Sequence, residues 1–500
     1  MDTKIFKSTK KFAIITLIIF CVMSISFINF VFALQQAGAI ANSEDKLYGE
    51  GLSQRNMSIK DCPNISAQYA ILTDKNGNII YERNAYESSK IASLTKIMTA
   101  IIGIENAELT EEFSISEDAV KIGESSAGLW KDDVIDMKSA LYALMVPSGN
   151  DAAEAICEFI GKKLIDKKDE RIRLKSVEDV ENEAAEKEID IEEVEDVYAA
   201  NVDQAFTMAM NAKANELGCV NSCFTNAHGL DDEEFSNNNQ HSCAADMAKI
   251  TKYAMQNDLF RKIVSGGDTT IMVKRNSSPV EIKLASTDIL IGNYEGCLGV
   301  KTGHTDIAGA CFSGAAIDQD GTEIYTIVLK SENETERFID TQKLFDWYFT
   351  NKVYFKPALE TSTRQTMTIN EETKDVGVVA NLVHSEWVGC KFPVTTETQD
   401  TAIPILSIAG NLHLEVNPAE IKGNFKAGDK VAELILTQHN TEVGKVNLIA
   451  VNDQPAPNIF QIVGVAFDRL GKNIANANTV FEHEILVSCD KINSKNNKTN

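Results

Sequence analysis

The stretch Ile91–Ala100 of this 500-residue chain places a serine three residues before a lysine and leads directly into a helical pattern. Apolar residues recur at helical spacing over 97–104, so Ser93 and Lys96 should project from one face, one turn apart. A serine hydroxyl becomes an effective nucleophile when a neighbouring base removes its proton. The spacing therefore predicts a nucleophile beside its base, at the start of a helix.

Lys96 can act as this base only while its amine is neutral. Burial and a second nearby cation both lower a lysine pKa, so this interpretation requires another positive side chain close in space. The helix start also offers free backbone N–H groups that can stabilise an oxyanion beside Ser93. The alternative is an N-capping serine and a solvated lysine, as on any exposed helix, and this motif alone does not decide between them.

A second candidate motif stands in a sharp turn between two predicted helices. The pattern over 137–146 is helical until Pro147 ends it, and another helix is expected over 152–160. Ser148 and Asn150 lie between them with one glycine separating them, which lets the backbone turn while both side chains point the same way. Such a turn can aim a hydroxyl and an amide into a cleft; the alternative is a plain turn with a residue that caps the next helix.

The third motif is the run Lys301-Thr302-Gly303, in the first of three strands predicted over 300–329. Short polar turns between the strands indicate an antiparallel meander. A cation, a hydroxyl and a glycine on an edge strand suit an extended peptide that ends in a carboxylate. The charge and the hydroxyl would hold the carboxylate, and the missing side chain would let the peptide lie close.

Ser-x-x-Lys, Ser-x-Asn and Lys-Thr-Gly, in this order and at these separations, resemble the motif set of penicillin-recognising serine enzymes. Within that group the chain most resembles the serine-type D-alanyl-D-alanine carboxypeptidases, the low-molecular-mass penicillin-binding proteins. The matching stretches are 93–99, 147–153, the Asn-x-His-Gly-Leu run that ends at Leu230, and 301–309. The resemblance implies an α+β fold, with a β-lactamase/transpeptidase-like catalytic domain over 60–352, an antiparallel sheet flanked by helices, and a small all-β C-terminal domain.

The resemblance also implies a role for each motif residue. Ser93 would form the acyl-enzyme, Lys96 would be its general base, and Ser148 would relay a proton to the leaving D-alanine. Lys301 would bind the substrate carboxylate and supply the second cation that lowers the pKa of Lys96. Backbone N–H groups of Ser93 and His304 would form the oxyanion hole. The implied substrate-binding residues are Asn150, Lys301, Thr302, Gly303 and His304.

The implied activity is removal of the terminal D-alanine from peptidoglycan stem peptides, with acylation by β-lactam antibiotics and without cofactor or metal. One alternative is a β-lactamase, which needs a carboxylate-held deacylating water; the chain has no clear Glu-x-x-Asn in an equivalent place. Another is a non-catalytic cell-envelope scaffold, against which the intact motif residues argue. The segment 286–290 departs from the family pattern because it lacks the asparagines often found before the third motif.

Net charge and the N-terminus bear on location. The formal charge of −25 argues against nucleic acid and against general attraction to anionic lipid, so membrane contact must come from apolar segments. Four lysines precede an uncharged apolar run over 12–33, the layout of a secretory signal peptide, and the run is long enough to serve as an anchor. Residues 1–41 are therefore expected to be a signal peptide or N-terminal anchor, and the protein is expected to be exported to the cell envelope and membrane-associated.

Ten cysteines are scattered without a Cys-x-x-Cys pair. Some are close enough in sequence to histidines to suggest a metal site, but their spacings match no common zinc pattern and small buried thiols explain them more simply. The residues concerned are Cys219, Cys223, His228, His241 and Cys243. His228 is interpreted as a loop-stabilising residue and is left out of the site.

Three further segments complete the expected organisation. Residues 162–198, first basic and then strongly acidic, look inserted; a projecting helical hairpin is predicted, with disorder as the alternative state and a docking arm for a basic partner as an alternative role. Short alternating segments over 356–452 predict a β-sandwich. Residues 455–490 include a crowded apolar stretch that predicts a membrane-associating amphipathic helix.

Overall fold

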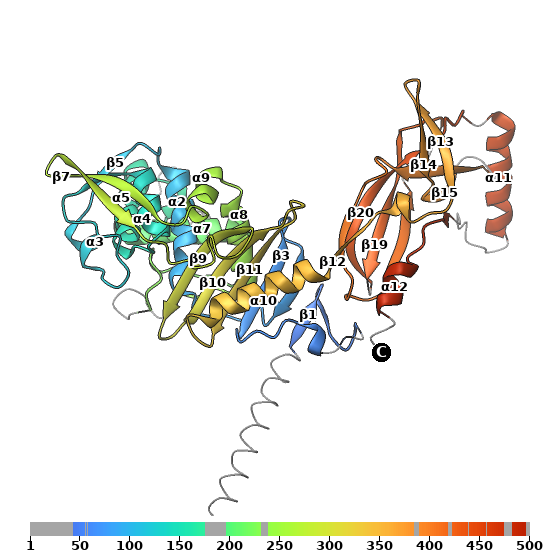
Figure 1. The fold of residues 1–500 in the computed structure, drawn as a ribbon. Coiled ribbons are helices and arrows are strands. Elements are labelled where there is room, and N and C mark those ends of the chain that lie inside the picture. Colours follow the sequence, from blue (N-terminus) through green and yellow to red (C-terminus); the bar gives the residue numbers. More distant parts are fainter. Residues whose placement is uncertain are drawn as a thin grey trace, which may run out of the picture. The chain divides into compact units, whose positions relative to one another are not determined.

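The computed structural model describes residues 44–55, 57, 59–175, 197–231, 239–384, 390–418, 423–438, 440–456, 458–474 and 483–496. The expected leader 1–41 and the acidic part of the insertion, 176–196, lie outside these residues. The chain divides into two compact units, Met1–Gly51 with Cys62–Asp346 and Leu52–Asp61 with Trp347–Asn500 (Figure 1).

The first unit is organised around a seven-stranded sheet with the order β2-β1-β4-β3-β11-β10-β9, so β9 is an edge strand. All its pairs are antiparallel, and β11, β10 and β9 form the meander that the sequence predicts. The hairpin of β3 and β4 is also formed. The strands are β1 Asp45–Leu47, β2 Glu50–Gly51, β3 Tyr69–Asp74, β4 Ile79–Arg83, β9 Cys297–Thr305, β10 Gly309–Ile317 and β11 Glu323–Ser331.

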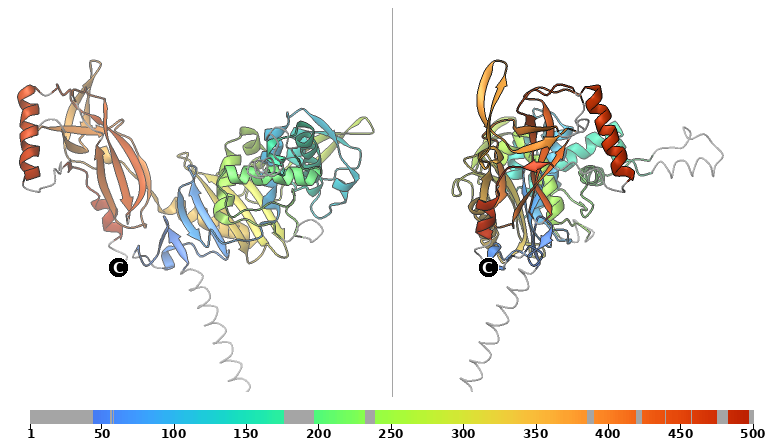
Figure 2. Two further views of the ribbon diagram at one scale, coloured as in Figure 1. Left: turned by 180° about the vertical axis from the view of Figure 1, so that it is seen from behind. Right: turned by 90° about the vertical axis from the view of Figure 1, so that its right-hand side faces the viewer.

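Helices cover both faces of this sheet. Successive residues of a strand point to opposite faces, so neighbouring residues of β10 contact different helices. The Ser313 hydroxyl of β10 meets the Thr251 hydroxyl of α8 at 2.8 Å. On the other face, Phe312 packs against Phe338 of α10, with ring centroids 5.2 Å apart and the rings tilted by 58°. Figures 1 and 2 show α8 and α10 on the two sides. The described α-helices up to residue 351 are α2 Thr95–Asn106, α3 Glu117–Lys121, α4 Met137–Met145, α5 Asn150–Lys167, α7 Val202–Glu216, α8 Ala244–Met255, α9 Asp258–Val264 and α10 Glu336–Asn351.

Helix α2 is the centre of the main core. Every residue from Thr95 to Gly103 is buried, as expected for a helix that is surrounded on all sides. The helices α4, α5, α7 and α8 all pack against it. A four-stranded sheet of β5 Glu112–Ser114, β6 Val134–Asp136, β7 Thr269–Arg275 and β8 Ser278–Leu284 lies at the end of the helical cluster away from the large sheet (Figures 1 and 2).

Two expectations about the bounds of helix α5 were wrong. Helix α5 begins at Asn150, two residues earlier than predicted, because Gly149 with its extended backbone serves as the N-cap. The same helix continues to Lys167, so the first residues of the expected insertion belong to α5, and Leu164 among them is buried. The helix ends at Lys168, which has a left-handed backbone conformation. Ahead of the expected catalytic domain, β1 and β2 pair with each other, and β1 also pairs with β4.

The residues that flank the acidic segment 176–196 pair with each other. Arg173 and Tyr198 form an antiparallel bridge, and the Leu174 N–H donates to the Val197 carbonyl at 2.7 Å. Segment 176–196 therefore leaves and re-enters the domain at one place. Its predicted helical hairpin lies outside the described residues and stays a prediction.

Between residues 352 and 450, the described part of the second unit consists mainly of β-strands. It has a six-stranded antiparallel sheet, β18-β19-β20-β16-β15-β21, and two two-stranded ribbons, β12-β17 and β13-β14. The buried Arg55 guanidinium donates to the carbonyls of Ala409 and Gln438 at 3.1 and 3.2 Å, which ties 52–61 to this unit. The strands are β12 Lys352–Phe355, β13 Arg364–Ile369, β14 Glu372–Gly377, β15 Ala380–Val383, β16 Lys391–Thr396, β17 Ile403–Leu406, β18 Leu412–Pro418, β19 Lys430–Gln438, β20 Thr441–Ala450 and β21 Glu484–Ile485.

The predicted apolar helix near the C-terminus is present as α11, Ile459–Ile474. A short helix, α12, follows at Asp490–Asn496. Within the part of the chain that the structure describes, no helix combines the length and the apolar character needed to cross a membrane.

Candidate active site

Ser93 lies in a tight 3-10 turn, Ala92–Leu94, that leads into α2. Two glycines clamp this turn. An ideal Cβ on Gly229 would lie 2.0 Å from the Ala92 carbonyl oxygen, and one on Gly303 would lie 3.2 Å from the Ser93 nitrogen. Ala92 itself has a φ of +48°, a conformation that costs energy for a residue with a side chain and persists only when its surroundings hold it. The 226–230 loop and strand β9 therefore fix the turn from two sides.

The amine of Lys96 has three oxygen neighbours at hydrogen-bond distance. They are the Ser93 Oγ at 2.8 Å, the Asn150 Oδ1 at 2.6 Å and the His228 carbonyl oxygen at 2.8 Å. Two of them, the amide oxygen and the carbonyl oxygen, can only accept hydrogen bonds. A neutral amine donates its two N–H groups to these two acceptors, and its lone pair then faces the Ser93 hydroxyl. In that state the 2.8 Å contact joins the Ser93 hydroxyl to a nitrogen that is able to accept its proton.

The electrostatics favour the neutral amine. Lys96 is completely buried, and this burial lowers its pKa well below the usual range for lysine; the nearby Lys301 lowers it further, and Asp151 opposes them. No carboxylate oxygen among the described residues lies within 4.0 Å of the Lys96 nitrogen, so no ion pair holds the proton on. The second cation that the sequence interpretation required is present as Lys301.

The Ser148–Asn150 turn is built by its glycine and by the following aspartate. An ideal Cβ on Gly149 would meet the Ala143 carbonyl oxygen at 2.7 Å, so only glycine fits there. The Asp151 carboxylate accepts from the Ser126 hydroxyl at 2.6 Å and from backbone N–H groups of the adjoining loop. Ser148 is buried, with a φ of +65°.

Both the oxygen and the nitrogen of the Asn150 side-chain amide form hydrogen bonds within the protein. Its oxygen accepts from Lys96, and its Nδ2 donates to the Gly123 carbonyl at 2.9 Å. The structure thus places Asn150 as a residue that positions Lys96. Its expected contact with a substrate amide stays a prediction.

Strand β9 carries the third motif along the edge of the sheet beside the Ser93 turn. The buried Lys301 ammonium donates to the Thr302 carbonyl at 2.9 Å, and the Thr302 hydroxyl meets the Thr287 hydroxyl at 2.7 Å. Burial lowers the pKa of Lys301 to about 7, with Arg337 adding to the effect and Asp288 opposing it. Among the described residues, no carboxylate oxygen lies within 4.0 Å of the Lys301 nitrogen. A buried cation without a close counter-ion is a place for an anion to bind.

The His304 side chain stands apart from this cluster. It is 44% exposed, and its Nδ1 lies 4.0 Å from a carboxylate oxygen of Glu334. Only its backbone continues the edge strand, opposite Ala310 of β10. Any part that His304 plays at the serine must come through its main chain.

Sequence reasoning missed three residues that surround Lys96 or the third motif. His228 had been left out of the site, yet its carbonyl oxygen is one of the two acceptors that orient Lys96; the Asn-x-His-Gly-Leu run was the signal available. Burial and the nearby Lys96 lower the pKa of its imidazole to about 3, so the ring itself stays neutral. Arg337 of α10 donates to the Gly303 carbonyl at 2.9 Å, and Asp288 lies before β9. No local sequence signal marks either one.

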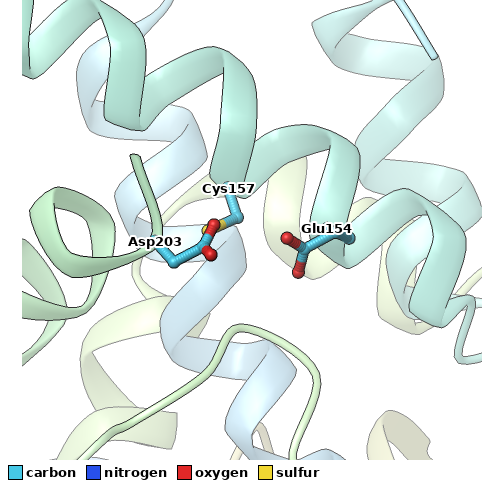
Figure 3. Close-up of side chains that lie close together, drawn as sticks. All are labelled: Glu154, Cys157 and Asp203. Carbon is cyan, nitrogen blue, oxygen red and sulfur yellow. The ribbon is translucent and has the colours of Figure 1, made fainter. Parts of the chain in front are cut away.

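A second group of titratable side chains lies one turn further along α5 (Figure 3). Ligand atoms of Glu154, Cys157 and Asp203 lie within 4.8 Å of one another, and the Cys157 thiol donates to the Asp203 carboxylate at 3.7 Å. Burial raises the pKa of Glu154 to about 8, and the charges of Asp203 and Glu158 add to this effect. Glu154 is therefore mostly protonated at neutral pH, which relieves the crowding of negative charge.

The cysteine- and histidine-containing segment 219–243 gives no comparable group. Within the described residues, the group of Glu154, Cys157 and Asp203 is the one in which three such ligand atoms come together. Cys219 and Cys243 are buried thiols, and no disulfide joins any of the described cysteines.

Comparison with known proteins places the site in a family context. The family model for D-alanyl-D-alanine carboxypeptidase matches residues 56–164 and 196–333, with its break at the charged insertion. The chain is 26% identical over 289 residues to the D-alanyl-D-alanine carboxypeptidase DacF of Bacillus subtilis, a match that takes in 57% of this chain and 62% of that protein. It is 26% identical over 301 residues to DacC of Escherichia coli, covering 58% of this chain and 62% of that relative. The chain thus spans less than two thirds of these relatives' length.

The likeness in fold extends further. The crystal structure of penicillin binding protein 5 from Haemophilus influenzae superposes with a TM-score of 0.51 at 22% identity, over 78% of this chain and 98% of that one. This neighbour supports the expected α+β architecture with a separate all-β C-terminal region.

Proposed function

We propose a function from the premise that this chain belongs to the D-alanyl-D-alanine carboxypeptidase family. The reaction is hydrolytic removal of the terminal D-alanine from a peptidoglycan stem peptide, through an ester on Ser93. The observation that carries the proposal is the Lys96 amine, which is buried, has no close counter-ion among the described residues, and is held by two acceptors so that its lone pair faces Ser93.

Acylation begins with attack of the Ser93 oxygen on the carbonyl carbon of the penultimate D-alanine. The hydroxyl proton passes to the Lys96 nitrogen, and negative charge develops on the carbonyl oxygen. Backbone N–H groups of Ser93 and His304 are the proposed donors to this oxyanion. When the C–N bond breaks, the leaving D-alanine nitrogen takes the proton from Lys96 through the Ser148 hydroxyl, which leaves an ester and a neutral lysine.

The substrate carboxylate is the anion proposed to bind at Lys301, with Thr302 as a hydroxyl donor and Gly303 leaving room for the peptide backbone. Arg337 contributes positive charge from behind the strand. This arrangement supports recognition of a free C-terminus: a peptide that ends in a neutral group leaves the buried ammonium unpaired, which is costly. The site therefore selects terminal over internal peptide bonds.

Water completes the cycle by attacking the ester. It gives a proton to Lys96 as it attacks, and that proton returns to the Ser93 oxygen when the ester bond breaks. The same serine is proposed to open β-lactam rings and form a stable ester with them. The proposed site of action is the cell envelope, outside the cytoplasm.

The decisive assay uses purified protein and a peptide that ends in D-Ala-D-Ala. We expect release of D-alanine, covalent labelling by a fluorescent penicillin, and loss of both in Ser93→Ala. Rapid penicillin turnover without peptide cleavage would instead favour a β-lactamase. A folded protein that neither cleaves nor is labelled would favour a non-catalytic scaffold.

Helix α11 supports a further proposal, that the protein associates with a membrane surface. Large apolar side chains of this helix face solvent, with Phe460 84% and Phe467 70% exposed. Burying one such ring in the lipid boundary gains about 2 kcal/mol, and an amphipathic helix can place several there at once. The other exposed apolar residues are Ile459, Ile462, Val463 and Leu470.

Vesicle sedimentation tests this second proposal. We expect the wild-type chain to sediment with lipid vesicles and a Phe460→Ser, Phe467→Ser variant to stay in the supernatant, with equal D-alanine release from a soluble peptide. Equal sedimentation of both proteins would contradict a role for α11.

A further inference from the structure

A buried carboxylate lies in the turn before the third motif and has no assigned role in the reaction. Asp288 is 8% exposed, and its Oδ1 accepts from the Leu290 N–H at 2.9 Å. Its second oxygen, Oδ2, is buried and has no hydrogen-bond partner among the described residues. A buried, half-satisfied carboxylate is costly unless a positive charge stands nearby.

Two buried cations supply that charge. The positive groups that act on Asp288 through space are Lys301 of β9 and Arg337 of α10. The turn is fixed against the strand because the Thr287 hydroxyl meets the Thr302 hydroxyl at 2.7 Å. This contact joins the turn that carries Asp288 to the strand that carries Lys301.

The need is mutual. Lys301 has no carboxylate oxygen within 4.0 Å in the described part of the chain, and Arg337 pairs only at 3.3 Å with Glu334, whose carboxylate is mostly exposed. Two cations close together in a dry site repel each other and each favours loss of the other's proton. Asp288 is a buried carboxylate that interacts electrostatically with both of these cations.

We propose that Asp288 is a positioning residue for substrate binding, which keeps the Lys301 ammonium charged in the empty site so that it is ready to receive the peptide carboxylate. Asp288 acts through Lys301 and does not itself touch the reacting atoms. Because it stays beyond ion-pair distance, it stabilises the ammonium without occupying the place of the incoming anion. The inference rests on the proposed function, since it names how that carboxylate site is maintained.

The charges around the pair agree in sign with this role. Burial and, to a smaller extent, the charge of Arg337 lower the pKa of Lys301, and Asp288 opposes them, so that this pKa is about 7. Burial raises the pKa of Asp288 itself to about 6, with Lys301 and Arg337 opposing. Above pH 6 Asp288 is therefore mostly ionised and supports Lys301. The other titratable groups in reach are Lys96 of α2 and the Cys297 thiol of β9.

The test is the pH dependence of kcat/KM for a peptide that ends in D-Ala-D-Ala, which reports groups of the free enzyme. Asp288→Asn keeps an oxygen for the Leu290 N–H and removes only the charge. We expect the alkaline limb of the profile to move to lower pH by about one unit, with most of the change above pH 6 appearing in KM and little in kcat. An equal melting temperature would confirm that the turn is intact.

Asp268, another aspartate that contacts this turn, gives a matched control. Asp268 accepts from the Ser286 N–H at 2.8 Å, at the exposed side of the turn, so Asp268→Asn should leave the alkaline limb in place. If Asp288→Asn also leaves the limb in place, or lowers kcat/KM equally at every pH, Asp288 is only structural and the inference fails. If the wild-type chain releases no D-alanine at all, the proposed function has failed instead.

Discussion

Replacement of Asn150 by aspartate tests how Lys96 is kept neutral. The substitution keeps the shape of the side chain and an oxygen beside the Lys96 nitrogen, at the observed 2.6 Å, but gives that oxygen a negative charge. At an effective dielectric constant of about 20, opposite charges at this distance attract by about 6 kcal/mol. Desolvation of the new carboxylate offsets part of this. We therefore expect the pKa of Lys96 to rise by at least about two units.

A protonated Lys96 cannot accept the serine proton, so the rate must fall until the pH passes the new pKa. We expect kcat at neutral pH to drop by about 100-fold and its acid limb to move up by at least about two pH units. The assay is kcat against pH, because kcat reports groups in the substrate complex, where Lys301 is paired with the substrate. Asn150→Ala, which removes the acceptor without adding charge, is the control and should not move the limb upward.

The opposite result would refute this reasoning. If Asn150→Asp lowers kcat by the same factor at every pH, the amide acts on the substrate and not on Lys96, and the role first expected from family resemblance is the correct one. Labelling by a fluorescent penicillin at high pH shows in either case whether the variant retains a working serine.

Three further predictions follow from individual contacts. Gly303→Ala places a Cβ against backbone atoms of the Ser93 turn, 2.9 Å from the Ile91 oxygen, and should slow acylation by at least about tenfold; Gly103→Ala, whose Cβ meets only ordinary contacts of 3.4–3.5 Å, should not. Lys301→Met should raise KM for a peptide with a free carboxylate by about 100-fold and move the acid limb of kcat upward, since Lys301 no longer lowers the pKa of Lys96. Replacement of 176–196 by a short glycine linker should leave D-alanine release and the melting temperature unchanged, and a loss of either would show that the insertion supports the domain.

The parts of the site that the sequence predicts are those in which a few adjacent residues determine the geometry. Ser93 and Lys96 are one helical turn apart, so their 2.8 Å contact follows from the period of the helix. The meander that carries Lys301 follows from alternation and turn residues in consecutive segments. In the first case the spacing of the residues matches the helical repeat, and in the second the alternation matches the two-residue repeat of a strand.

The contributions that sequence reasoning missed come from tertiary packing. The oxygen that orients Lys96 at His228 belongs to the main chain, so the residue type at that position carries no direct signal for it. Arg337 reaches Gly303 across the face of the sheet, and only the docking of α10 brings them together. Strands of two or three residues such as β1 and β2 are too short to show an alternation, and only their pairing defines them.

The central claim, a neutral Lys96 beside Ser93, can be measured directly by NMR of 13C-labelled lysine side chains, with the Lys96 signal assigned through a Lys96→Arg variant. We predict that the Lys96 resonance has the chemical shift of a free amine at a pH where the exposed lysines are still ammonium ions, and that Asn150→Asp returns it to the ammonium position. A Lys96 signal that titrates together with the exposed lysines would contradict the account.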